Sequence, residues 1–233
     1  MAKILASSKD AMAHVKSGMT LMVGGFGVCG LPENLVHALA ETNVKDITLI
    51  SNNGSVDNWG NGKLIANKQI VKLFASYIGE NSELAEQFIS GQIDVELVPQ
   101  GTLAERIRAG GAGIPAFFTP TGFGTKVAEG KEARNINGKD CILEEALLAD
   151  VSFVKAHKAD KLGNLVFNKT AQNFNPLMAT AGKITIVEVE EIVENGELDP
   201  DEIHLPSIYV NYIVKGEQYD RRIEKRTYSS ATS

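Results

Sequence analysis

Seven consecutive residues rich in glycine are the part of this sequence best suited to chemistry. The segment consists of Gly24, Gly25, Phe26, Gly27, Val28, Cys29 and Gly30. An apolar run at 19–23 precedes it, and Pro32 follows at a position where proline opens a helix without losing a hydrogen bond. Glycine lets a ligand approach the main chain, and a helix start offers unpaired N–H groups. This order of strand, loop and helix predicts a site for an anionic or carbonyl-bearing ligand, without naming a reaction.

Amide side chains follow two of the other apolar runs. Gln100 comes just after the run at 95–98, and Asn52 and Asn53 follow the run at 47–50. The carboxyl ends of parallel strands form the edge where open α/β sheets bind ligands, so we expect these amides beside the glycine loop. An amide donates to a carboxylate without adding charge. Two simpler interpretations stay open: Gln100 caps the helix that follows it, and the asparagines only shape turns.

Two nucleotide-binding interpretations of the glycine loop lack the residues that they need nearby. Residues 25–30 formally match the Gly-x-Gly-x-x-Gly dinucleotide fingerprint, which also needs an acid at the end of the next strand. That strand, 47–50, is followed by Ser51-Asn52-Asn53, and Asp46 lies at its other end. No Gly-Lys-Ser/Thr run follows the glycines, which argues against a nucleoside triphosphate loop. A tight turn needed only for packing remains an alternative.

Apolar runs of strand length alternate with helical patterns along most of the chain. The predicted strands are 21–23, 47–50, 71–75, 95–98, 151–156 and 184–189. Ser8 is predicted to cap a helix that runs to Val15, and Asn81 or Ser82 to cap a helix over 83–89. Two further helices are predicted, one opened by Pro32 and running through Leu39, and a short one from Thr102 to Ala109. This alternation is typical of a parallel sheet covered on both faces. We therefore expect an α/β fold, a mostly parallel open sheet with helices on both faces, in a single domain over 1–233.

Two regions depart from this alternation. Residues 110–130 are rich in glycine and proline and contain Phe117, Phe118 and Phe123. This segment is too glycine-rich for a regular helix and too aromatic for a linker, so it predicts an ordered lobe or flap over the sheet. The basic residues near the end favour a solvated terminal helix; they are Arg221, Arg222, Lys225 and Arg226.

The composition excludes several classes of protein. The 233 residues carry a net charge of −6, which argues against a nucleic-acid partner, and no apolar run is long enough to cross a bilayer. Cys29 and Cys141 have neither disulfide nor metal-ligand spacing, and the four histidines lack zinc-site spacing. The first ten residues lack the pattern of a signal peptide. We expect a cytoplasmic, metal-free protein in which Cys29 is a small buried filler.

Several uncommon runs carry a resemblance that extends over residues 3–228. They are Gly24-Gly25-Phe26 with Gly30 and Pro32, Ser51-Asn52-Asn53, Pro99-Gln100-Gly101-Thr102-Leu103-Ala104-Glu105, Phe118-Thr-Pro-Thr-Gly122, Gly163-Asn164-Leu165, Asn173-Phe174-Asn175, Glu188-Val-Glu-Glu-Ile-Val193 and Ile203-His204-Leu205-Pro206. Together they resemble the α-type subunit of family I coenzyme A transferases.

The resemblance implies a covalent reaction between two carboxylic acids. In this family the attacking glutamate belongs to the β subunit; it reacts with an acyl-CoA to become a glutamyl-CoA thioester, and the acceptor acid then reverses the steps. The chain would move coenzyme A from succinyl-CoA to a 3-oxo acid such as acetoacetate, in an α/β hetero-oligomer, α2β2. Coenzyme A thioesters would be substrates, with no cofactor bound permanently. The expected surroundings are cytoplasmic, with no membrane and no nucleic acid as partner.

The resemblance also assigns roles to residues of this chain. It implies that the loop from Gly24 to Gly30 binds coenzyme A, and that Gln100 and Asn53 bind the small carboxylate. No catalytic residue is expected here, because Glu194-Asn195-Gly196 lacks the serine that precedes the family's nucleophile and is typical of a solvated turn. The alternatives are a transferase subunit for acetate or another short-chain acid, and a sugar-phosphate isomerase or sensor-like domain.

Overall fold

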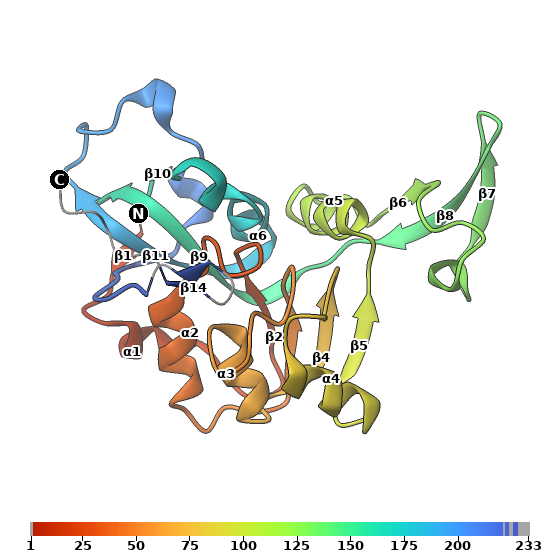
Figure 1. Ribbon diagram of the computed structural model, residues 1–233. Helices are drawn as coiled ribbons and strands as arrows, with labels where there is room; N and C mark the ends of the chain where they lie inside the picture. The colour runs from red at the N-terminus through yellow and green to blue at the C-terminus, as the bar shows by residue number, and fades with distance from the viewer. Residues whose placement is uncertain (1, 221, 224–225, 228–233) are drawn as a thin grey trace.

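A nine-stranded sheet forms the body of the protein in the computed structural model, which describes residues 2–220, 222–223 and 226–227 (Figure 1). Its strand order is β1-β12-β11-β9-β2-β3-β4-β5, and β10 pairs with β9. The pairings along this order are parallel, and β10 joins antiparallel. The structure therefore confirms a mostly parallel open sheet.

The bounds of the elements are as follows. The strands are β1 (Lys3–Ile4), β2 (Thr20–Val23), β3 (Ile47–Ile50), β4 (Ile70–Ala75), β5 (Asp94–Leu97), β6 (Ala116–Thr119), β7 (Ala133–Ile136), β8 (Lys139–Glu145), β9 (Ala149–Asp160), β10 (Leu165–Val166), β11 (Gly182–Val193), β12 (Tyr212–Lys215), β13 (Arg222–Ile223) and β14 (Arg226–Thr227). The helices are α1 (Ser8–Ala11), α2 (Glu33–Ala40), α3 (Asn61–Ala66), α4 (Ser82–Ile89), α5 (Gln100–Gly111) and α6 (Asn175–Ala181). The 3-10 helices are η1 (Met12–His14), η2 (Lys126–Ala128), η3 (Lys169–Gln172), η4 (Pro200–Glu202) and η5 (Ser207–Tyr209).

Alternate residues of the central strands pack into two separate hydrophobic cores. In β2, Leu21 and Val23 lie in one core with residues of α2, α3 and α4, while Met22 lies in the other core with residues of α5 and α6. Successive side chains of a strand point to opposite faces, so a strand that is apolar throughout needs other elements packed against both of its faces. Figure 1 shows α2, α3 and α4 on one side of the sheet and α5 and α6 on the other.

The connections bring several loops to one edge. The chain steps through β2, β3, β4 and β5 with α2, α3 and α4 as crossovers, and after α5 and the excursion β6–β8 it returns as β9 beside β2. The segments that follow β2, β3, β4, β5, β9 and β11 all leave from the carboxyl edge, because these strands are parallel. This is the edge where the sequence predicts a site.

Helix starts differ slightly from the sequence predictions. Ser7, not Ser8, caps α1, because its side chain accepts from Asp10 N and the Asp10 carboxylate reaches back to Ser7. Asn81 caps α4 as predicted, with 2.8 Å from Leu84 N to its Oδ1. Pro32 is the cap of α2 rather than its first residue. Side-chain caps thus decide boundaries that periodicity alone leaves open.

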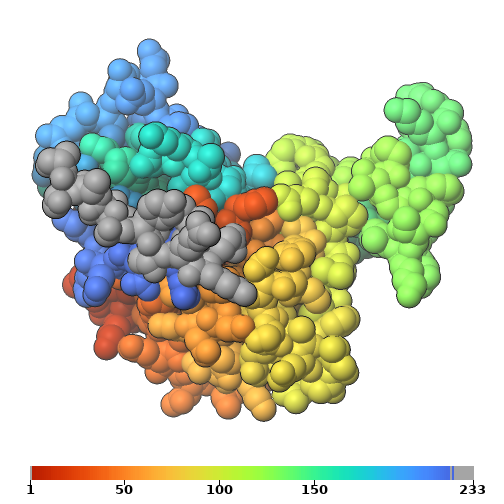
Figure 2. Space-filling view, in the orientation of Figure 1, coloured from red at the N-terminus to blue at the C-terminus, as the bar shows by residue number. Residues whose placement is uncertain are grey.

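Residues 116–145 form an arm that stands away from the body. Its antiparallel strands pair in the order β6-β8-β7, and Figure 2 shows the arm projecting from the body. The prediction of an ordered lobe is right, but a flap over the sheet is wrong. Arg106 of α5 anchors the arm, because its Nε donates to Glu145 O at 2.7 Å and its Nη1 lies 2.7 Å from Glu96 and 3.7 Å from buried Glu144. These contacts direct the arm outward.

The C-terminal segment does not form the predicted helix. Residues 222–223 and 226–227 pair as the antiparallel strands β13 and β14, while Arg221 and Lys225 lie outside the described residues. Just before them, Asp220 accepts from the buried Trp59 indole at 3.0 Å, and the Arg222 guanidinium lies 6.0 Å from the Trp59 ring centre. Trp59 therefore holds the C-terminal segment against the body.

Candidate functional site

The glycine loop folds into a tight turn between β2 and α2. Phe26 and Cys29 exchange two backbone hydrogen bonds, of 2.9 and 3.0 Å, and the Gly27 N–H donates to Asn52 Oδ1 at 3.4 Å. Gly25 and Gly27 have φ angles of 121° and 61°, which favour glycine. Phe26 is 48% exposed at the turn. The loop is thus a preformed projection at the carboxyl edge.

Three polar side chains meet beside this loop, at the ends of β3, β4 and β5. Asn52 Nδ2 donates to Ser76 Oγ at 3.0 Å and to Gln100 Oε1 at 3.2 Å, and Ser76 Oγ donates to Gln100 Oε1 at 3.0 Å. We call Asn52, Ser76 and Gln100 the amide cluster. The helix-cap interpretation of Gln100 is wrong, because α5 begins at Gln100 itself and its cap, Pro99, has no side-chain hydrogen bond.

Asn53 is arranged differently from Asn52. Its Oδ1 accepts from Ser55 N at 2.9 Å, and its main-chain carbonyl accepts from the buried Asn61. This is the turn chemistry that the sequence leaves open for the asparagines. The Asn53 Nδ2 and the Gln100 Nε2 make no hydrogen bond within the residues that the structure describes. Two amide NH₂ groups therefore remain as donors at this edge.

Ser76 was missed by sequence reasoning, although a signal was present. It follows the strand at 70–75, as Asn52 and Gln100 follow neighbouring strands. A search of every strand end, rather than of the amide residues alone, would have found it. Its hydroxyl fixes the Gln100 amide so that Oε1 points inward.

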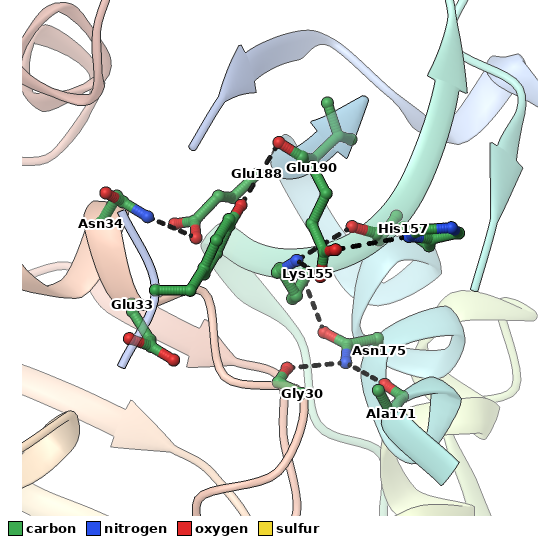
Figure 3. Close-up of polar contacts among 12 residues, drawn as sticks. Gly30, Glu33, Asn34, Lys155, His157, Ala171, Asn175, Glu188 and Glu190 are labelled. Atoms are coloured by element: carbon green, nitrogen blue, oxygen red, sulfur yellow. Dashed lines mark hydrogen bonds and ion pairs between the residues drawn. The ribbon is translucent and has the colours of Figure 1, made fainter. Parts of the chain in front are cut away.

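A second polar group lies beyond the end of β2, on β9 and β11 (Figure 3). Lys155 Nζ lies 2.7 Å from Glu190 Oε1 and 4.1 Å from the Tyr219 ring centre, and His157 Nδ1 lies 3.5 Å from Glu190 Oε2. We call Lys155, His157, Glu188 and Glu190 the charged cluster. Sequence reasoning missed it too, although a lysine and a glutamate inside buried strands were a signal.

Glu188 ties the charged cluster to the helix after the glycine loop. Its carboxylate, fully buried, accepts from Asn34 Nδ2 at 2.9 Å and from Leu35 N at 3.0 Å, in the first turn of α2. Burial raises the pKa of Glu188 to about 7, although these hydrogen bonds favour the charged form. Burial and the nearby Glu188 raise the pKa of the Tyr219 hydroxyl, which donates to Val189 O at 3.3 Å.

Two hollows border the glycine loop. One is a cavity of about 200 Å³ lined by residues 28–31 and by Lys155, His157 and Glu190. The other is an open hollow of about 760 Å³ lined by Phe26, Cys29 and the segment around η3 and α6. Cys29 is exposed, so the expectation of a buried filler is wrong; its thiol lies 3.9 Å from Thr170 Oγ1. Residues of the loop therefore line both hollows.

Two further observations concern the described part of the chain. No group of three or more histidine, cysteine, aspartate or glutamate side chains is arranged there to hold a metal ion. None of the helices there has the length and apolar character needed to cross a bilayer.

The fold and this edge match a known class of enzymes. Residues 5–216 match the model of the coenzyme A transferase family, and the chain belongs to that family. Among its relatives, the A-type subunit of a probable succinyl-CoA:3-ketoacid coenzyme A transferase of Bacillus subtilis is 59% identical, over all of this chain and 98% of the relative. The A-type subunit of a succinyl-CoA:3-ketoacid coenzyme A transferase of Helicobacter pylori is 55% identical, over 99% of this chain and all of the relative.

Solved structures agree on the fold. An acyl-CoA transferase of Escherichia coli O157:H7 superimposes with a TM-score of 0.83 at 20% identity, over 99% of this chain. This chain spans about half of that protein, 49% of its length. The names of the sequence relatives do not favour the two alternatives, a subunit for short-chain acyl transfer or a sugar-phosphate isomerase or sensor.

Proposed function

We propose that this chain is the α-type subunit of a two-chain coenzyme A transferase that moves coenzyme A from succinyl-CoA to a 3-oxo acid such as acetoacetate. Relatives that align over nearly its whole length carry names with this activity. The observation that carries the proposal is the pair of unpartnered amide NH₂ groups, on Gln100 and Asn53, at the edge beside the glycine loop in the described part of the chain.

The amide cluster suits a small carboxylate. Gln100 and Asn53 would each donate to one carboxylate without bringing a charge, while Asn52 and Ser76 hold the Gln100 Oε1 away from the acid. A hydrogen bond from a neutral amide to an ionised acid is worth about 1.5–3 kcal/mol. This favours binding, and it leaves the acid nucleophilic enough to attack a thioester.

The glycine loop, residues 24–30, would line the binding site of the coenzyme A thioester. Its Val28 and Gly30 N–H groups make no hydrogen bond within the described chain, and both residues line the smaller hollow, so these groups could donate to a carbonyl or phosphate oxygen. Oriented N–H donors lower the energy of a developing oxyanion without reorganising during the reaction. Coenzyme A enters and leaves as a substrate, with none bound permanently.

The partner subunit completes the site. A β subunit would bring the nucleophilic glutamate, in an α2β2 assembly in which residues 1–233 act as one domain. The free thiols of Cys29 and Cys141 suit a reducing compartment such as the cytoplasm.

Reconstitution of the two subunits tests the proposal. The isolated chain, the isolated partner and their mixture are each incubated with succinyl-CoA and acetoacetate, and acetoacetyl-CoA is measured. We expect turnover only in the mixture, with a thioester adduct on the partner. Normal turnover by the isolated chain, or an adduct on a glutamate of this chain, contradicts the proposal.

A further inference from the structure

The turn between η3 and α6 holds the returning half of the glycine loop. Asn175, fully buried, donates from Nδ2 to Gly30 O at 3.0 Å and to Ala171 O at 2.9 Å, and its Oδ1 accepts from Lys155 N at 2.8 Å (Figure 3). One side chain thus joins the loop, the turn and strand β9. No other buried side chain is hydrogen-bonded to all three in the described residues.

Asn173 supports the same part of the loop. Its Nδ2 donates to Cys29 O at 3.0 Å and to Thr170 O at 3.1 Å, and its Oδ1 accepts from Phe174 N at 2.7 Å. Two successive loop carbonyls, of Cys29 and Gly30, are therefore held by side-chain amides from one turn. A carbonyl that accepts such a bond cannot rotate without losing it.

The glycines of the loop are fitted to this turn. A Cβ at Gly24 would lie 1.9 Å from Asn175 Oδ1, and a Cβ at Gly30 would lie 2.5 Å from Ala171 O. Gly30 also has a φ of 71°. These two glycines are explained by close approach to the turn, whereas Gly25 and Gly27 are explained by the shape of the loop itself.

The direction of two N–H groups follows from these contacts. In a trans peptide the N–H points opposite to the C=O, and the peptides described here contain no cis bond. Fixing the Cys29 and Gly30 carbonyls therefore fixes the Gly30 and Leu31 N–H groups. Neither N–H has a hydrogen-bond partner in the described residues, so both are held as donors for something outside the chain.

We propose that Asn175, supported by Asn173, is a positioning residue for coenzyme A transfer: it holds the glycine loop so that its N–H groups meet an oxygen of the acyl-CoA substrate. This inference rests on the proposed function. Asn175 touches no substrate in this arrangement and acts through Gly30.

The test compares two buried amide side chains that each donate to main-chain carbonyls. Asn175 lies at the carboxyl edge of the sheet, and Gln69 lies at the amino edge. Asn175→Asp removes the donor to Gly30 O and keeps the acceptor for Lys155 N. The matched control is Gln69→Glu, because buried Gln69 donates from Nε2 to Leu39 O, Thr42 O and Val44 O at the amino edge. Asn173→Asp, at a half-buried position, is a milder variant should Asn175→Asp fail to fold.

Each variant is assembled with the partner subunit, and two quantities are measured. We expect Asn175→Asp, or the milder variant, to speed amide hydrogen exchange of the segment 24–31 about tenfold. We also expect kcat for succinyl-CoA and acetoacetate to fall at least tenfold, with KM changed less than threefold. The Gln69→Glu enzyme is compared with the asparagine variants at a similar lowering of the denaturation midpoint. Its rate of hydrogen exchange at 24–31 and its kcat should stay within twofold of wild type.

Three results would overturn the inference. They are unchanged exchange at 24–31 in the asparagine variants, faster exchange with unchanged kcat, and an equal loss of kcat in the Gln69→Glu control. If the wild-type assembly transfers no coenzyme A, the proposed function fails instead, and the exchange measurement alone decides whether Asn175 holds the loop.

Discussion

The amide cluster and the charged cluster lie at the same edge of one sheet, on either side of the glycine loop, and they differ in how their polar groups are used. In the charged cluster, Lys155 and Glu190 pair with each other, and Glu188 accepts bonds from the first turn of α2. In the amide cluster, the NH₂ group of Gln100 has no partner among the described residues. We expect the first arrangement to stabilise the fold and the second to keep a donor available for a ligand.

The difference between the two clusters shows that the charged side chains at this edge pair with one another, while the side chain with a free donor is neutral. A buried charge costs several kcal/mol unless it is paired, so the buried Lys155 ammonium needs the Glu190 carboxylate beside it. A neutral amide costs less to leave partly unpaired at a surface, and it binds an acid without forming a strong ion pair that slows release. Changes in the charged cluster should therefore alter stability, and changes in the amide cluster should alter catalysis.

Lys155→Met is expected to have the largest effect. It removes the cation that pairs with Glu190 and that also attracts the Glu188 carboxylate, and breaking a buried pair from one side costs about 3–5 kcal/mol. We expect a loss near the lower limit in urea denaturation, because Glu190 is 32% exposed. Lys158→Met is the matched control on the same strand: its pair with Glu191 is exposed and should cost less than about 1 kcal/mol. Equal losses in the two variants would contradict the assignment.

Glu188→Gln should change how stability depends on pH. The pKa of Glu188 rises from 4.5 to about 7 on folding, so the folded state binds this proton more tightly than the unfolded state. The contribution of protonated Glu188 to the unfolding free energy is fully present below pH 4.5. It falls by about 3 kcal/mol as the pH rises to 7.

Urea denaturation at pH 5 and pH 8 measures this effect. The difference in unfolding free energy between the two pH values should shift in Glu188→Gln by most of that amount. Glu191→Gln, which changes an exposed carboxylate of the same strand whose pKa Lys158 lowers, is the control and should not reproduce the shift. An unchanged pH profile in Glu188→Gln would show that Glu188 is not protonated in this range.

Gln100→Ala should affect catalysis and leave stability nearly unchanged. Loss of one hydrogen bond to an ionised acid should lower kcat/KM for the acceptor acid about tenfold or more, and the KM for succinyl-CoA should change less. Gln100→Glu should lower it further, because a carboxylate repels the acid. Steady-state kinetics with several acceptor acids separates the two substrates. A wild-type value of kcat/KM in both variants would remove Gln100 from the site.

Cys29→Ser should have the smallest effect, although Cys29 lies in the loop between the two clusters. Its thiol is exposed and has one weak contact, with Thr170. We expect unfolding free energy within about 0.5 kcal/mol of wild type and kcat/KM within twofold. A tenfold loss of kcat/KM would mean that the side chain, and not only the main chain, of the loop takes part.

Strands β2, β3, β4, β5, β9 and β11 were predictable from the sequence, because each contains a short apolar run that stands out locally, whereas β1, β10 and β12 of the same sheet were not predicted. The glycine loop and Gln100 were predictable at one edge for the same reason. The hydrogen-bond and ion-pair partners of Ser76, Lys155 and Asn175 were not predictable, because these partners lie far away in the chain. The arm was only partly recognised: β7 is largely exposed, and the buried residues of β8 include the charged Glu144, so neither strand shows a clear apolar alternation.

The placement of β1 has a consequence for how the chain is made. Ile4 pairs with Ile213, about 200 residues later, so the first strand finds its neighbour only when β12 has left the ribosome. The pairings among β2, β3, β4 and β5, in contrast, join strands that follow one another in the chain. The order of synthesis and the order of the sheet therefore disagree at two places, the outer edge formed by β1 and β12 and the central pairing of β2 with β9.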